Sequence, residues 1–189
     1  LHAQAALDAG LPFGRLVAGP RDQLAPIYAT PQYRQWARQN ASLRLLHGPM
    51  LGSVTSESAL VWLRTARTGS VQVRVLDAGT GKLASTSGKV ATGKDSDFTA
   101  VAQLTGLEAG HAYRYEIEVD GVKVAVENTR FQTYPLQGAA ASFEVGFGGG
   151  AGFVPKWEYM WDTILESAPL AFLMLGDNVY IDDPTHPLT

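Results

Sequence analysis

The residues best suited to chemistry lie near the end of the 189-residue chain, where Asp177 and Tyr180 stand three positions apart. A carboxylate and a phenolate are hard oxygen donors, which suit a divalent or trivalent cation. The phenol serves as a ligand once the metal has displaced its proton. Asn178, Asp182 and Asp183 lie beside this pair and could hold its ligands in place. The pattern predicts a metal site formed by Asp177 and Tyr180.

Two strands and a helix must position this pair. Residues 170–175 are apolar without alternation, which is typical of a parallel strand buried on both faces. Gly176 permits a tight turn at the carboxyl edge of the sheet, where ligands bind in open α/β folds. Residues 143–147 predict a first strand, and together the segments predict a right-handed βαβ unit. Its helix, over 156–167, carries an apolar face of Trp157, Met160, Trp161, Ile164 and Leu165.

The block Gly176-Asp177-x-x-Tyr180 after an apolar strand resembles the second metal-ligand block of calcineurin-like metallophosphoesterases. It is most similar to the branches that use a tyrosinate, the purple acid phosphatases and the alkaline phosphatase D family. The resemblance implies a phosphate ester substrate and metal cofactors, either iron and calcium or zinc and manganese. It also implies that Asp177 bridges two metals and that Tyr180 binds the ferric ion.

The glycines 148–150 depart from the pattern of these families. The first strand of purple acid phosphatases ends in an aspartate ligand, and that of alkaline phosphatase D ends in a cysteine. This chain has no side chain there that could bind metal, and it contains no cysteine. The resemblance is therefore to a divergent, cysteine-free branch of alkaline phosphatase D, with the number and identity of the metals left open.

Other interpretations use the same residues. Gly146-x-Gly148-x-x-Ala151 satisfies the dinucleotide-binding fingerprint, with Asp177 as the acid downstream. In that fold the helix begins inside the glycine motif, whereas the helix signals here begin at Pro155. Asp177 could also be an ordinary turn residue that caps the next helix. The acids 182 and 183, with His186, could form an extra calcium site or a solvated loop.

Composition excludes several classes of function. The net charge of −3 offers no basic surface for nucleic acid, and no stretch is long enough to span a membrane. The absence of cysteine excludes disulfides and thiolate chemistry. Leu1 in place of Met suggests a processed or excised chain from which any export signal is already gone. We expect a bacterial protein exported to the periplasm or the medium. The short sequence after Tyr180 cannot supply neighbours for the 170–175 strand, and we expect the rest of the domain in the same parent chain or a companion fragment.

The first three quarters of the chain show no catalytic signature. Residues 1–46 predict a helical or irregular segment, with Thr30-Pro31 as the start of a helix over 31–39. Residues 47–135 alternate apolar and polar side chains between turn signals, including the hairpin turn Asp120-Gly121. Leu107 to Tyr113 resembles the tyrosine corner of fibronectin type III domains, Trp62 fits their buried tryptophan, and His111 reads as a solvated loop residue.

The predicted fold is mixed: an N-terminal antiparallel β-sandwich of fibronectin type III or Ig-like kind, followed by the first βαβ unit of an incomplete α/β metallophosphoesterase domain. A linker over 136–142 separates the sandwich from the catalytic segment, 143–189. The predicted function is that of the N-terminal part of a metal-dependent phosphatase or phosphodiesterase. The alternative is a non-catalytic binding or structural module, and a nucleotide-binding domain is the third possibility.

Overall fold

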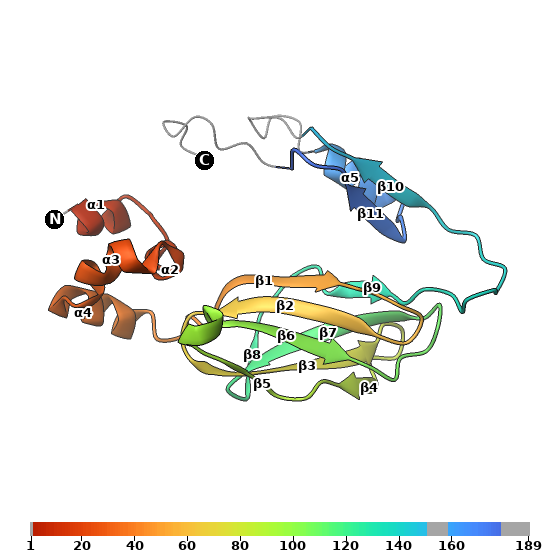
Figure 1. Ribbon diagram of the computed structural model, residues 1–189, viewed down its shortest axis with the longest axis horizontal. Helices are drawn as coiled ribbons and strands as arrows, with labels where there is room; N and C mark the ends of the chain where they lie inside the picture. Colours follow the sequence, from red (N-terminus) through yellow and green to blue (C-terminus); the bar gives the residue numbers. More distant parts are fainter. Residues whose placement is uncertain (1, 151–158, 179–189) are drawn as a thin grey trace. The chain divides into compact units, whose positions relative to one another are not determined.

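The computed structural model describes residues 2–150 and 159–178, and the chain divides into two compact units, Leu1–Leu136 and Gln137–Thr189 (Figure 1). Antiparallel sheets predominate and the helices are short, which agrees with the mixed class predicted from the sequence. No helix in the described ranges is long and apolar enough to cross a bilayer.

The first unit begins with an arm of short helices, residues 2–40: α1 (His2–Asp8), α2 (Phe13–Ala18), α3 (Arg21–Tyr28) and α4 (Pro31–Gln39). The bounds of α4 confirm the predicted helix. Thr30 caps it, since its Oγ1 accepts the backbone N–H of Tyr33 at 3.1 Å. Trp36, which is buried, donates its Nε1–H to the Gln4 side chain at 3.0 Å and so joins α4 to α1.

Ion pairs and hydrogen bonds attach the helical arm to the strands that follow. Arg64 and Arg21 both pair with the carboxylate of Asp97, at 2.7 and 2.9 Å. Arg64 also donates to the Ala18 carbonyl at 3.0 Å, and the Arg21 guanidinium lies 4.2 Å from the centre of the Phe98 ring. Burial raises the pKa of Asp97, but the two arginines outweigh that effect, so this pKa lies below its ordinary value.

Two antiparallel sheets follow, and we call their strands, β1 to β9, the two-sheet domain. One sheet has the order β1-β2-β6, with β1 (Leu45–Gly52), β2 (Ala59–Thr65) and β6 (Thr99–Leu104). The other has the order β4-β3-β7-β8, with β5 paired to β3 and β9 paired to β7. Its strands are β3 (Gly69–Asp77), β4 (Leu83–Thr86), β5 (Val90–Thr92), β7 (Ala112–Val119), β8 (Val122–Val124) and β9 (Arg130–Gln132).

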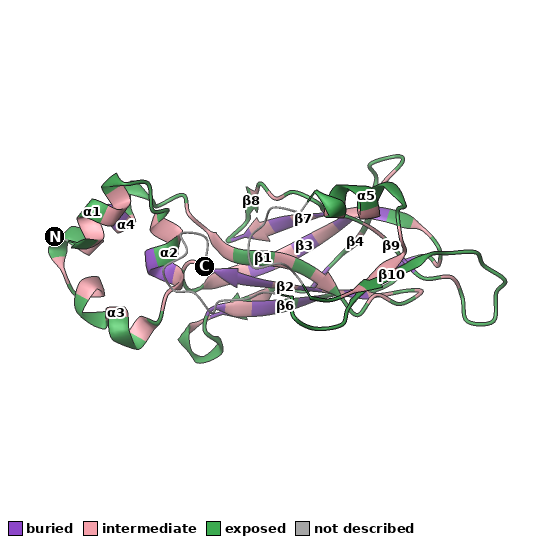
Figure 2. Ribbon diagram, turned by 90° about the horizontal axis from the view of Figure 1, so that it is seen from above, coloured by how far each residue is buried: buried purple, intermediate pink, exposed green. Residues whose placement is uncertain are grey.

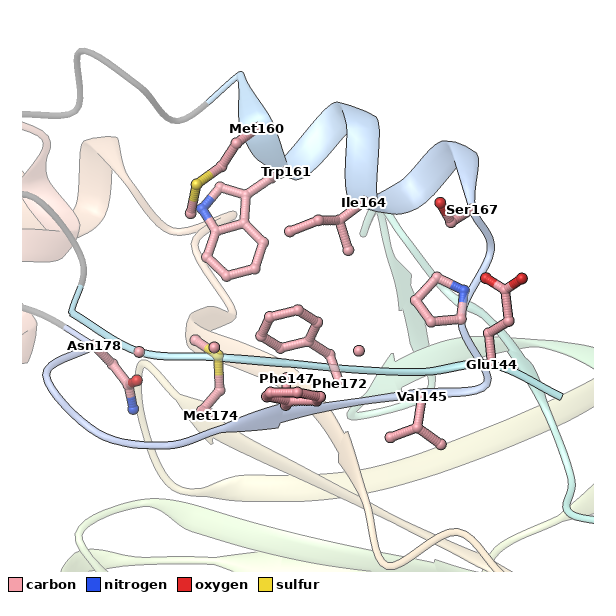
Figure 3. Close-up of a pocket in the computed structure, with 14 residues that line it drawn as sticks. Glu144, Val145, Phe147, Met160, Trp161, Ile164, Ser167, Phe172, Met174 and Asn178 are labelled. Atoms are coloured by element: carbon pink, nitrogen blue, oxygen red, sulfur yellow. The ribbon is translucent and has the colours of Figure 1, made fainter.

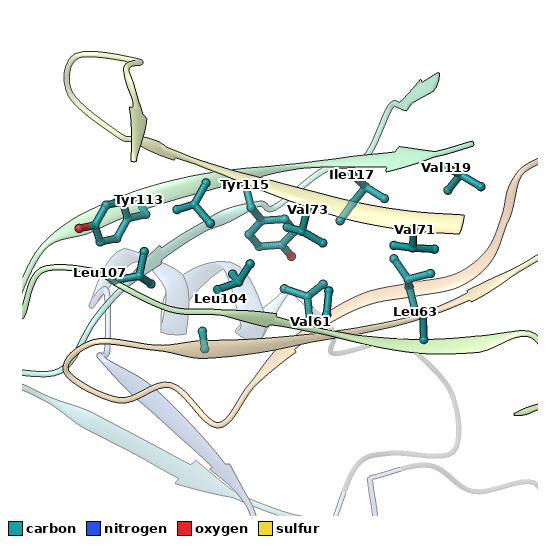
Figure 4. Close-up of a cluster of buried hydrophobic side chains, with 14 residues drawn as sticks. Val61, Leu63, Val71, Val73, Leu104, Leu107, Tyr113, Tyr115, Ile117 and Val119 are labelled. Carbon is teal, nitrogen blue, oxygen red and sulfur yellow. The ribbon is translucent and has the colours of Figure 1, made fainter. Parts of the chain in front are cut away.

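The hydrophobic core of the two-sheet domain takes side chains from both sheets (Figure 4). Along β7, buried residues alternate strictly with less buried ones, as the period of two in the sequence predicts. The buried residues gather in these strands, shown in purple in Figure 2. The largest side chains with almost no exposure are Val61, Leu63, Val71, Val73, Val75, Leu104 and Ile117.

Two local predictions for this domain are confirmed. The hydroxyl of buried Tyr113 accepts the backbone N–H of Glu108 at 2.9 Å, and Leu107 is part of the core, as the corner resemblance implies. Asp120 and Gly121 have φ of +53° and +73° and join β7 to β8. Positive φ at both central residues is the requirement of the tight hairpin turn that Asp-Gly predicts.

One other prediction is wrong, and a second is only partly right. Trp62 is only partly buried, because Val61 and Leu63 are the β2 residues that enter the core and Trp62 lies on the outer face, opposite Met50 and Val101 in the neighbouring strands. His111 is not simply solvated, because its Nε2 pairs with Asp77 and its ring lies 4.8 Å from that of Tyr113.

The Asp77 carboxylate has several hydrogen-bond partners. It accepts the backbone N–H of Thr80 and the Thr80 hydroxyl, and it pairs with the His111 ring. These hydrogen bonds, those from Thr80 first, hold the pKa of Asp77 far below its ordinary value. The contact ties the turn after β3 to the corner before β7.

The second unit contains β10 (Val145–Gly148), α5 (Met160–Glu166) and β11 (Ala171–Met174) in its described part. The strands pair in parallel, with Gly146 opposite Phe172. This confirms the parallel pairing predicted for the two segments, although both strands are shorter than predicted. The helix predicted over 156–167 is observed from Met160, and its first residues lie outside the described ranges.

Candidate metal site

The carboxyl ends of β10 and β11 lie at one edge of the parallel pair, and the backbone pairing continues beyond both strands. Leu175 N–H donates to the Gly148 carbonyl at 2.8 Å, and Gly150 N–H donates to the Gly176 carbonyl at 3.2 Å. The glycines 148–150 are therefore paired directly with the turn that carries Asp177. This places the two loops singled out in the sequence side by side.

Asp177 is exposed and has a left-handed backbone, with φ of +51°. Aspartate and asparagine adopt this conformation more readily than other residues with a side chain. The turn begins with Gly176, whose φ of +113° is open to glycine alone among ordinary residues. The sequence signal for a tight turn at this point is thus confirmed, and it leaves the Asp177 carboxylate accessible at the sheet edge.

The other predicted site residues are only partly tested. Asn178 is exposed and lines a hollow beside the strands. Tyr180, Asp182, Asp183 and His186 lie outside the described residues, so the pairing of Asp177 with Tyr180 stays a prediction. Within residues 2–150 and 159–178, no three His, Asp or Glu side chains cluster in a way that could hold a metal ion. Asp177 is the one predicted metal ligand that lies within the described residues.

The glycines of β10 fit the side chain of Phe172. A Cβ added to Gly146 would lie 2.5 Å from Cδ2 of that ring, which is closer than carbon atoms approach each other. Trp161 packs edge-on against the same ring, with centroids 5.3 Å apart. Gly146 is thus explained by packing within the unit. α5 is described from Met160 onward, and residues 151–158, which separate it from the glycine motif, lie outside the described residues.

A hollow of about 470 Å³ lies between α5 and the strands (Figure 3). Trp161 and Ile164 face it from the helix, whereas Val145 and Phe147 project from the opposite side of the strands. Leu165, predicted for the inward face of the helix, is 71% exposed. Two strands are too narrow a sheet to cover the whole face of the helix.

Strand β11 is not buried on both faces, contrary to the prediction from its apolar run. Leu173, Met174 and Leu175 are 54%, 52% and 66% exposed. The strand has one neighbour in the described part of the unit, and its face away from α5 carries no covering layer there. No residue in the ranges 137–150 and 159–178 is fully buried.

One protein-family model matches the two-sheet domain. Residues 42–136, just over half of the chain, match the model of a domain of unknown function, DUF7800. The chain belongs to this family. No curated protein matches it.

Among solved structures, one described as the structure of PhoD is similar in fold, with a TM-score of 0.58 and 18% sequence identity. The similarity covers 69% of this chain but only 27% of the PhoD chain, so this chain spans about a quarter of that protein. The sensor domain of the anti-sigma factor RsgI4 from Pseudobacteroides cellulosolvens also matches, at 15% identity over 46% of this chain and 90% of that one. The TM-score of that match is 0.34.

Proposed function

We propose that this chain is the N-terminal part of a metal-dependent phosphoric ester hydrolase related to alkaline phosphatase D. The observation that carries the proposal is Asp177, exposed on a tight turn at the carboxyl edge of two parallel strands. This edge is where α/β folds place their ligands. The fold similarity to PhoD supports the same assignment.

We further propose a finer domain organisation. The two-sheet domain would be a fibronectin type III or Ig-like sandwich over 47–135, preceded by the helical segment 1–46. Residues 136–142 would be a linker, and 143–189 would open an incomplete α/β catalytic domain with a βαβ unit. The uncovered apolar side chains of β11 support this last assignment, because parallel sheets are covered on both faces in complete domains.

In this proposal Asp177 holds a cation, and Tyr180 binds the more acidic cation if two are present. A cation bound there would make hydroxide available near neutral pH and would offset the negative charge of the phosphoryl oxygens. The chain's own part is to fix the carboxylate at the edge, which the paired loops do. Iron and calcium, or zinc and manganese, are the proposed metals, and the proposed location is the periplasm or the medium of a bacterium.

Asp177→Asn in the full-length parent tests the proposal. Asparagine keeps the shape of the side chain and tolerates the left-handed backbone, so the free energy of unfolding should change by less than about 0.5 kcal/mol. Loss of a residue that only holds a metal ligand in place reduces metal affinity or activity by roughly 10- to 100-fold. Loss of the ligand itself should reduce metal content and hydrolysis of p-nitrophenyl phosphate by more than that. Asp162→Asn, an exposed acid on α5, is the matched control and should leave both unchanged.

Tyr180→Phe gives a second measurement. It should weaken one metal and remove any visible absorption, because a phenolate bound to ferric iron gives a charge-transfer colour. Full activity and metal content in both the Asp177 and the Tyr180 variant would reduce the Gly176–Tyr180 block to a turn and remove the phosphoesterase assignment.

The second candidate is a non-catalytic module, favoured by the absence of side chains at glycines 148–150. It predicts no metal-dependent hydrolysis by the full-length parent. For the isolated 189-residue chain we expect no phosphatase activity under either function, together with association through the open edge of β11. Metal-dependent turnover by this chain alone would contradict that expectation.

A further inference from the structure

The outer faces of the two antiparallel sheets differ in chemistry. On the sheet that contains β3 and β7, the outward side chains are charged and paired with one another. Glu116 pairs with Lys123 at 2.7 Å and with Arg114 at 3.2 Å. Glu118 pairs with Arg74 at 3.7 Å. Charged side chains of this kind stay hydrated, so this face is suited to contact with water.

The outer face of the β1-β2-β6 sheet carries apolar side chains instead. Met50, Trp62 and Val101 lie side by side on it, because Trp62 pairs across the strands with both of the others. Met50 is 63% exposed and Val101 is 49% exposed. With Leu60 these side chains line a shallow hollow of about 480 Å³, and none of the residues that line it is charged. We call these four side chains the outer patch.

The small size of the outer patch limits what can bind to it. Two of its four side chains, Leu60 and Trp62, are already partly buried within the sheet. The patch therefore presents less area than the roughly 800 Å² that each partner buries in a stable complex of separate molecules. A segment of the same parent chain needs less contact area, because its tether holds it at a high effective concentration.

The chain leaves the two-sheet domain beside the outer patch. The backbone N–H of Tyr134 donates to the Thr55 carbonyl at 3.0 Å. Thr55 lies in the connection from β1 to β2, close in sequence to the pair formed by Gly52 and the patch residue Leu60. The parent chain that follows is therefore tethered at this end of the β1-β2-β6 sheet.

We propose that the outer patch is a docking surface for the part of the parent chain that follows Thr189. This rests on the proposed function, which requires the rest of a catalytic domain, and the matched region is only 27% of the PhoD chain. The segment that docks presents apolar side chains to Met50, Trp62 and Val101. A charged group pressed against this hollow would lose its water without gaining a partner.

Hydroxyl-radical labelling, measured by mass spectrometry, tests this proposal. In the 189-residue chain the exposed Met50 should be labelled rapidly. In the full-length parent its labelling should be slower by about fivefold or more, because side chains at the centre of a contact are almost fully shielded from water. Leu83, which is 53% exposed on the other sheet, is the internal control and should be labelled equally in both proteins.

Val101→Lys in the full-length parent is the matching variant. The lysine places a charge in the outer patch without entering the core, so Met50 should be labelled as fast as in the 189-residue chain. Leu83→Lys adds the same charge to the other sheet and should leave Met50 protected. Protection of Met50 that persists in Val101→Lys would overturn the proposal. If this variant fails to fold, the native parent and the 189-residue chain still decide the question.

Equal labelling of Met50 in the full-length parent and the 189-residue chain would overturn the proposal. Slow labelling in the 189-residue chain would also overturn it. Protection that grows with protein concentration would assign the outer patch to a second copy, and protection at every concentration would show that it is covered within these 189 residues. None of these measurements depends on catalysis, so full activity and metal content in the Asp177 and Tyr180 variants would remove the proposed function without changing the labelling of Met50.

Discussion

Replacement of Gly146 by alanine is the sharpest test of how the second unit packs. The new Cβ would lie 2.5 Å from Phe172 Cδ2 and 3.0 Å from Cε2, so the ring must retreat by about 1 Å to reach normal contact. Trp161 lies against the same ring, with centroids 5.3 Å apart, so a shift of the ring also disturbs this aromatic pair. Overpacking of this kind costs about 1–3 kcal/mol, and loss of an aromatic pair about 0.5–1.5 kcal/mol.

Two effects reduce this cost. Alanine is favoured over glycine in a strand by about 0.5–1 kcal/mol, and Phe172 is only partly buried, so the ring has some freedom to move. The expected net destabilisation of the second unit is about 1–2 kcal/mol. Amide hydrogens of β10 and β11 should then exchange about 5- to 30-fold faster, measured by mass spectrometry on the 189-residue chain.

Gly148→Ala is the matched control, because its Cβ would stand 3.4 Å from Phe172 Cζ and needs only a small adjustment. We expect its exchange rates to equal those of the native chain or to be slower. Phe172→Leu should reduce the cost of Gly146→Ala, since the shorter side chain leaves room for the new methyl group. Equal exchange rates in the two alanine variants would refute the packing argument.

Three further predictions concern the two-sheet domain. Tyr113→Phe removes the acceptor of the partly buried Glu108 backbone N–H and should lower the free energy of unfolding by about 1–2 kcal/mol in a urea titration. No change would show that water replaces the hydroxyl. The pKa of Asp77 is lower in the folded state than in the unfolded state, so its ionised form stabilises the fold fully above about pH 4, and this stabilisation is lost as the pH falls further. Asp77→Asn should therefore flatten the acid side of a plot of unfolding free energy against pH. An unchanged acid side would contradict the role of Thr80 as the hydrogen-bond donor to Asp77. Trp62→Gln should lower the free energy of unfolding less than Val61→Ala, because the alanine variant opens a core cavity that costs about 1–3 kcal/mol. The reverse order of melting temperatures in thermal unfolding would place Trp62 in the core.

The parts of the fold that the sequence predicted well depend on neighbours in the chain. The Thr30-Pro31 helix start and the Asp120-Gly121 turn each need a few consecutive residues, and both were confirmed. The alternation of β7 follows from one buried face. These features are local, so the residue types alone are enough to specify them.

The face of β2 was harder to predict because apolar residues occupy both sides of this strand. Leu60 and Trp62 alternate with Val61 and Leu63, and size alone favoured the tryptophan as the core residue. The available signal was Arg64, which shares the side of Trp62 and therefore marks the outer face. Its low exposure in the structure comes from the helical arm that covers it.

The candidate site was predictable only in outline. The carboxyl edge and its turn followed from an apolar run ending at Gly176, but the contact between Gly149 and the Gly176 carbonyl depends on the register of two strands about 25 residues apart in sequence. The same register explains Gly146, which faces Phe172. A glycine opposite a large aromatic residue in the neighbouring predicted strand was the signal that could have revealed this packing.

The attachment of the helical arm has a consequence for how its sequence can vary. Arg64 binds the Ala18 carbonyl, and Arg67 binds the carbonyls of Ala41 and Leu43. Both arginines lie in the region matched by the family model. The groups that they bind are the main-chain oxygens of Ala18, Ala41 and Leu43. Every amino acid supplies the same carbonyl group, so substitutions at Ala18 or Ala41 that preserve the backbone path leave these bonds intact. An arm that keeps Arg21, whose side chain pairs with Asp97, and the same backbone path at Ala18 can therefore vary in composition at other positions and still be held by Arg64.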